Sequence, residues 1–141
     1  MKHSTMNWMI AAAALVVAAG SASAQTFNAE IPMAFRVGEK VMAPGPYQIR
    51  VATGGNVQVF VYGLETHSSA IVLSGPQADA PKDWRREGQP KIAFECAGNT
   101  CSMRQLWDGK NRFAYGFNVH KEPTLEARRM EVVTLAMTKV R

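Results

Sequence analysis

Residues 25–37 have the sequence QTFNAEIPMAFRV, in which apolar side chains recur at every second position. These apolar residues are Phe27, Ala29, Ile31, Met33, Phe35 and Val37. Because successive side chains of an extended chain point to opposite faces, the alternation predicts a β-strand with one buried face. Pro32 has no backbone N–H to donate, so we expect an edge position or a bulge at that point.

The same period continues along the chain in short runs. Turns are predicted at Gly38-Glu39-Lys40, at Pro44-Gly45, and at the hairpin signal Gly54-Gly55. Further strands are predicted over residues 47–51, 57–61, 70–73, 91–96, 101–107, 113–119 and 132–140. About eight short strands without alternating helices predict an all-β domain, as an antiparallel β-sandwich or a small β-barrel. At the end of the chain, one helix over 125–137 is the alternative to a helical piece over 125–130 followed by a closing strand.

The stretch 75–90 interrupts this pattern with prolines, glycines and charges. It predicts a surface excursion containing a short helix. We expect Asp79 to cap that helix, Pro81 to lie in its first turn and Gly88 to follow its end. Trp84 is the predicted anchor of the helix on the core.

The chain begins with the features of a signal peptide. Lys2 precedes 12 consecutive apolar residues, Trp8 to Ala19, and the small-residue pattern Ala22-Ser23-Ala24 follows. Twelve residues are too few for a transmembrane helix, which needs about 20. We therefore expect a signal-peptide helix in residues 1–24, cleavage between Ala24 and Gln25, and no transmembrane anchor afterwards. The predicted location is the periplasm or the cell exterior.

Residues 25–141 are then one mature all-β domain, long enough to bury a core. Without Lys2, the formal net charge falls from +5 to +4, and the positive residues are scattered. Export makes nucleic acid an unexpected partner. Envelope components or another protein are the partners that the sequence allows, and it does not specify the oligomeric state.

Two cysteines, Cys96 and Cys101, flank a four-residue loop between predicted strands. A hairpin places such residues opposite each other, so a structural disulfide is the prediction for an oxidising compartment. The alternatives are a redox pair, which usually has Cys-x-x-Cys spacing at a helix start, and a zinc site completed by His67 and His120.

No catalytic motif is present, and no cofactor or metal is predicted. His67 is followed by Ser68 and Ser69, but neighbours on an extended chain point to opposite faces and do not form a nucleophile–base pair. The acidic residues are spread singly along the chain. A hydrolase would require acids such as Glu65, Glu95 and Asp108 to meet in one cleft.

Aromatic and basic residues suggest one recognition surface, because such surfaces stack on bases, sugars or partner side chains. Its candidate members are Trp84, Arg85, Arg86, Arg104, Trp107 and Arg112, with Tyr62 and Tyr115 as further aromatics. The alternative is that the aromatic rings belong to the core.

Two stretches resemble a family of uncharacterised exported bacterial β-domain proteins. The pattern PF-x-F-x-V-G followed by P-A-G-x-Y is matched by residues 32–38 and 42–49, and a K-L-V-F…L-x-x-x-W hairpin by residues 91–94 and 105–107. A basic segment with a glutamate, residues 126–129, follows the hairpin. Met33 replaces the family's aromatic residue, and Ala-Pro-Gly replaces Pro-Ala-Gly. The resemblance implies an all-β exported domain and supplies no activity.

Together these features predict an exported, non-catalytic β module that acts through binding or protein interaction. One alternative is a carrier of a small apolar ligand inside a β-barrel, since barrels of about eight strands hold one ligand. The other is a hydrolase whose carboxylates are assembled by the fold.

Overall fold

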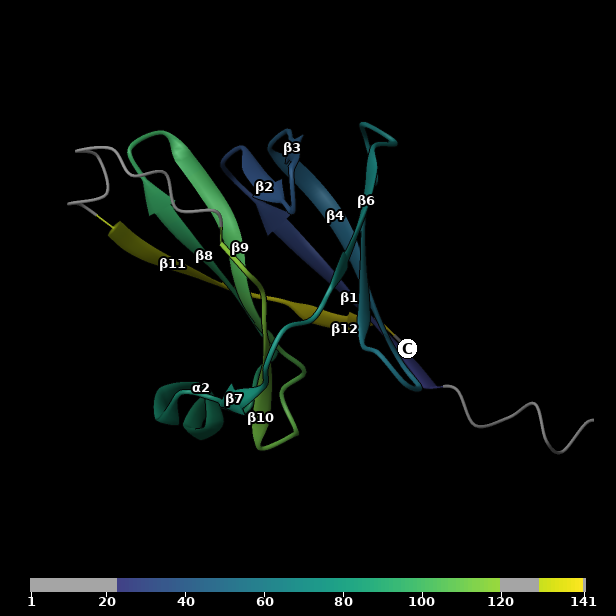
Figure 1. The fold of residues 1–141 in the computed structure, drawn as a ribbon, viewed down its shortest axis with the longest axis vertical. Helices are drawn as coiled ribbons and strands as arrows, with labels where there is room; N and C mark the ends of the chain where they lie inside the picture. The colour runs from purple at the N-terminus through teal and green to yellow at the C-terminus, as the bar shows by residue number, and fades with distance from the viewer. Residues whose placement is uncertain (1–22, 120–129, 141) are drawn as a thin grey trace, which may run out of the picture.

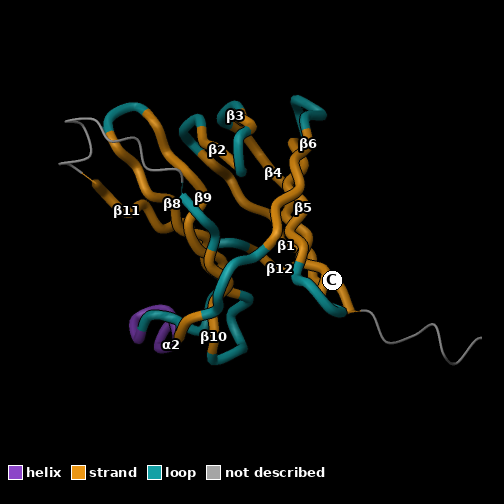
Figure 2. Tube along the Cα trace, viewed as in Figure 1, coloured by secondary structure: helices purple, strands orange, loops and turns teal. Residues whose placement is uncertain are grey.

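The computed structural model describes residues 23–119 and 130–140, which form two β-sheets and one short helix (Figures 1 and 2). The elements are β1 (Ser23–Ile31), β2 (Phe35–Val37), β3 (Lys40–Met42), β4 (Gly45–Thr53), β5 (Gln58–Gly63), β6 (Ser69–Leu73), β7 (Ala78–Asp79), α2 (Lys82–Glu87), β8 (Lys91–Ala97), β9 (Thr100–Trp107), β10 (Phe113–Gly116), β11 (Met130–Ala136) and β12 (Thr138–Val140). The predicted all-β class is confirmed. Of the two predicted architectures, the described strands fit the β-sandwich and do not form a closed β-barrel.

The first sheet has the strand order β12-β1-β4-β5-β6, and every neighbouring pair in it is antiparallel. The second sheet has the order β11-β8-β9-β10-β7, with the β2–β3 hairpin attached to β9. In Figure 1 the first sheet is on the right, the second on the left, and α2 lies at the lower end of the second. The hairpin signal Gly54-Gly55 is confirmed between β4 and β5.

Within the described residues, the chain passes from one sheet to the other at four places: after β1, between β3 and β4, between β6 and β7, and between β11 and β12. The single strand predicted over 27–37 is two strands: β1 ends before Pro32, and β2 starts at Phe35 in the second sheet. Proline lacks the N–H that would continue the ladder, which explains the break. The last of these crossings is at Met137, between β11 and β12. Met137 is buried, and its N–H donates to the Pro90 carbonyl at 2.9 Å.

The main core lies between the sheets and is built from the alternating apolar residues. The Phe35 ring packs edge-on against Tyr47 and Phe94, with ring centroids 5.0 and 5.3 Å away. The Tyr47 hydroxyl donates to the Ala43 carbonyl, so its polar end is satisfied within the core. The periodicity of residues 27–37 thus predicted the buried face correctly, although the chain changes sheet within it.

The excursion over 75–90 contains the predicted helix, with one correction. Pro81 occupies the N-cap position without a side-chain cap, and Asp79 lies in β7, where its carboxylate is 3.6 Å from the Arg112 guanidinium. The predicted Asp79 cap is therefore wrong, because the carboxylate is directed to Arg112. Gly88 ends the helix in the left-handed conformation, with φ 69°, as expected.

Trp84 anchors α2 as predicted, on a second small core at the outer side of the second sheet. This cluster contains Ala80, Trp84, Ala93, Trp107 and Ala114. The alanines leave room for the two indoles, so one helical turn is enough to cover that part of the sheet.

The predicted closing segment over 132–140 is β-structure, but it is two strands, β11 and β12, which are divided at Met137 and belong to different sheets. The alternative of one helix over 125–137 is wrong for residues 130–137, and residues 125–129 lie outside the described part of the chain. Of the predicted signal peptide, only Ser23 and Ala24 are described, and they pair with Thr53 and Ala52. Across residues 23–119 and 130–140, no helix has the length and apolar character needed to cross a membrane.

Candidate ligand-binding pocket

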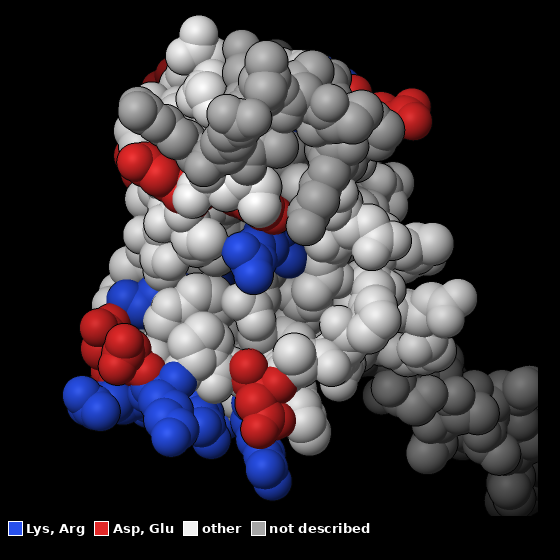
Figure 3. Space-filling model, turned by 60° about the vertical axis from the view of Figure 1, so that its left-hand side comes forward, with Lys and Arg blue, Asp and Glu red and all other residues white. Residues whose placement is uncertain are grey.

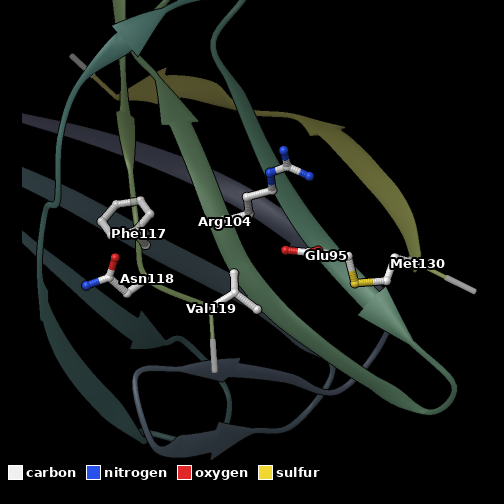
Figure 4. A pocket seen from close by; sticks show the side chains of 6 residues that line it. All are labelled: Glu95, Arg104, Phe117, Asn118, Val119 and Met130. Carbon is white, nitrogen blue, oxygen red and sulfur yellow. The ribbon is translucent and has the colours of Figure 1, made fainter. Parts of the chain in front are cut away.

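An open pocket of about 580 Å³ lies on the outer face of the second sheet (Figure 4). Strand β8 contributes Glu95, β9 contributes Arg104 and β11 contributes Met130. The segment that follows β10 contributes Phe117, Asn118 and Val119. The pocket therefore spans the sheet across several strands.

Glu95 is the buried charged group of this pocket. Its neighbours Phe94 and Cys96 belong to the main core, so the alternation of β8 turns Glu95 to the opposite face. Glu95 is only 7% exposed, yet none of the hydrogen bonds or ion pairs of the described residues involves its carboxylate. Every fully buried polar side-chain atom of the described residues has a hydrogen-bond partner. Since the Glu95 oxygens have none, they are in contact with solvent. The carboxylate therefore opens into the pocket.

A β-bulge in β9 positions Arg104. Ala93 pairs with Gln105 while Phe94 pairs with Met103, so Arg104 is the extra residue. Its carbonyl accepts the Phe117 N–H at 2.8 Å, which fixes the start of the pocket segment against the bulge. Bulges redirect side chains in this way. The Arg104 side chain is exposed and forms no ion pair with Glu95.

The remaining lining residues are mostly apolar. Phe117, Val119 and Met130 supply hydrocarbon and thioether surface, and Asn118 supplies one amide. Figure 3 shows a basic group at the middle of this face, with acidic atoms beside it, apart from the mixed charges at the α2 end. Among the described residues, the pocket thus combines one acid, one base, one amide and three apolar side chains.

The predicted recognition residues do not form one surface. Trp84 and Trp107 are 8% and 2% exposed, and the Trp107 Nε1 donates to the Asn111 carbonyl at 2.6 Å. Both rings belong to the core, as the alternative reading stated. Arg85 and Arg86 are exposed on α2, and Arg112 pairs with Asp79 nearby. Of the predicted recognition residues, Arg104 alone lines the pocket. Tyr115 is buried, whereas Tyr62 is exposed.

The predicted Cys96–Cys101 disulfide is present, with an S–S distance of 2.07 Å. The two residues are directly opposed partners in the β8–β9 hairpin, and both face the main core. The disulfide closes the hairpin at the end nearest Glu95.

The three acids considered for a hydrolase are not gathered in the pocket, where Glu95 is the only acid among the described lining residues. Asp108 is used in its own turn, where it accepts the Lys110 and Asn111 N–H groups at 2.9 and 2.8 Å. Glu65 is exposed in the β5–β6 turn. His67, in the same turn, contacts the Tyr62 hydroxyl through Nδ1 at 2.9 Å. The described residues include no group of three or more potential metal-ligating side chains.

The comparisons with known proteins supply no relative. No protein-family model, curated protein or solved structure matches the chain. The resemblance to exported bacterial β-domain proteins therefore stays a prediction, and the pocket has to be interpreted from its own geometry.

Sequence reasoning identified Glu95 and Arg104 for other roles and did not single out the apolar lining. One signal was available: Glu95 is the charged residue within the otherwise apolar run Ile92–Cys96. The β9 bulge has no comparable signal, since neither glycine nor proline marks it.

Proposed function

We propose that this protein is an exported, non-catalytic β module that binds a small ligand in the pocket on the outer face of the second sheet. The observation that carries the proposal is the Glu95 carboxylate, which belongs to a mostly buried residue and opens into the pocket without a partner among the described residues. Ligand sites are typically clefts in which a few polar groups are left available to orient the ligand.

The position of the pocket distinguishes this proposal from a carrier with an internal cavity. The space between the two sheets is filled by large side chains such as Phe27, Phe35 and Phe94. The proposed ligand instead lies against the outer face, where charged and apolar groups are both accessible. Export is part of the proposal and is supported by the leader sequence and the disulfide.

Native mass spectrometry tests this proposal. The protein is expressed with its own leader, purified without reductant and exposed to a small-molecule extract of the producing cells. We expect a mature chain starting at Gln25, two hydrogens lighter than its reduced form, with a bound mass that Glu95→Gln removes. Glu30→Gln is the matched control, because Glu30 is exposed on the outer face of the first sheet. No bound mass, a bound mass insensitive to Glu95→Gln, or turnover of the ligand would contradict the proposal.

A further inference from the structure

We propose that the pocket selects a zwitterionic molecule with an apolar body, such as a free amino acid with an aliphatic side chain. Its ammonium group would pair with Glu95 and its carboxylate with Arg104. This inference rests on the proposed function and specifies the ligand class of the same site.

The cationic part of the ligand follows from the burial of Glu95. Glu95 is 7% exposed as a residue, its carboxylate oxygens face solvent in the pocket, and no described residue pairs with them. A ligand ammonium has three donors and a full positive charge, so it pairs with this carboxylate better than a neutral group does. An anionic ligand without an ammonium would add repulsion at the same carboxylate.

The anionic part follows from Arg104. Its guanidinium is exposed at the pocket and forms no ion pair within the described chain. A guanidinium binds a carboxylate through two parallel hydrogen bonds, which fixes the orientation of the ligand. Because Glu95 and Arg104 leave each other unpaired, one ligand bearing both charges satisfies both.

The apolar part follows from the remaining wall. In Figure 4, Glu95 lies between Arg104 and Met130, and Val119 and Phe117 lie on the other side of Arg104. A charged head group held at Glu95 and Arg104 therefore places the rest of the ligand beside the Met130 thioether or Val119. Since one acid and one base are the charged residues among the described lining residues, a ligand with no net charge matches that set electrostatically.

Isothermal titration calorimetry with three probes tests this assignment. L-leucine carries both charges, leucine methyl ester lacks the carboxylate, and isocaproate lacks the ammonium. We expect leucine to bind at least about tenfold more tightly than either analogue, as expected for one lost charge-assisted hydrogen bond. Equal binding of all three probes, or no binding of leucine, overturns the assignment.

Two variants assign the charges to their residues. Glu95→Gln should lower the affinity for leucine by about tenfold or more, and it should leave the affinity for isocaproate unchanged or raise it. Arg104→Gln should lower the affinity for leucine by a similar factor and leave the affinity for leucine methyl ester unchanged. Glu30→Gln and Arg50→Gln, both on exposed positions of the first sheet, should change nothing. Because the two pocket variants predict opposite analogue selectivity, loss of folding cannot imitate the expected pattern. Leucine affinity unchanged in both pocket variants overturns the assignment.

The two proposals fail in different ways. If an extract component binds in a Glu95-dependent manner while leucine does not, the zwitterion assignment is wrong and the binding function stands. If neither binds, both proposals are wrong.

Discussion

Cys96 and Cys101 are directly opposed, and both are buried against the main core. Replacing both with alanine keeps the positions apolar and removes the covalent link. We expect the free energy of unfolding to fall by about 2 kcal/mol, the value that loop entropy gives for so short a ring. Denaturant titration of oxidised protein measures this change. A double variant as stable as the oxidised wild type would contradict the stabilising role.

Two tyrosines should make the free energy of unfolding depend on pH in the alkaline range. Burial raises the pKa of Tyr47, and a side-chain hydrogen bond with Thr66 partly offsets this increase. Burial and the negative charge of Asp108 raise the pKa of Tyr115, while a hydrogen bond with Asn111 lowers it. Below about pH 10 both hydroxyls are protonated in the folded and unfolded chains, so their contribution is fully present.

As the pH rises above about 10, the unfolded chain loses these protons first, and the free energy of unfolding should fall through the folded-state pKa values. Denaturant titrations from about pH 8 to about pH 11 measure this loss, and Tyr47→Phe should reduce it. An equally steep loss in Tyr47→Phe would exclude Tyr47 as a cause.

At the scale of elements, α2 is held by one side chain. Trp84 is its buried residue and packs with Trp107 above Ala93 and Ala114. Trp84→Ala should lower the free energy of unfolding by about 3–5 kcal/mol, the usual cost of removing a buried indole. Arg85→Ala, one position along on the exposed side, should change it by less than about 0.5 kcal/mol. Denaturant titration measures both, and equal effects of the two variants would contradict a Trp84 anchor.

The β5–β6 turn is packed tightly around Gly63. A Cβ at this position would lie 2.2 Å from the Thr66 Oγ1 and 3.3 Å from the Tyr47 ring. Gly63→Ala should therefore cost about 1–3 kcal/mol of unfolding free energy. The same substitution in a Thr66→Ala background should cost less, because the closest contact is gone. A double-mutant cycle on thermal or denaturant unfolding tests this, and full additivity would contradict the clash with Thr66.

The elements differ in how far the sequence predicts them. Strands with strict alternation were predicted well, because burial of one face dictates the period of two. Asp79 was assigned to a cap because local spacing allowed it, whereas the partner that it takes, Arg112, is distant in the sequence. The sheet change after Pro32 follows from tertiary packing and leaves the alternation intact. The pocket was not predicted, since it depends on the β9 bulge and on which strands become neighbours.

At the scale of the whole molecule, the two sheets should unfold together. The chain crosses between them four times within the described residues, and one continuous core lies between them. We expect one cooperative transition. Trp84 and Trp107 both lie against the second sheet, so tryptophan fluorescence reports that sheet, while far-ultraviolet circular dichroism reports both. Transitions that do not coincide in the mature chain would show that the sheets unfold separately.

The pairing of β12 with β1 has a consequence for how the molecule is made. Thr26, near the start of the described chain, is the partner of Val140, near its end. A chain that emerges with its N-terminus first can form β4, β5 and β6 early, but β1 gains its partner β12 only after all the other described strands have been synthesised. Pairings this distant in sequence slow folding. The first sheet should therefore be completed later than the β4–β5–β6 meander that it contains.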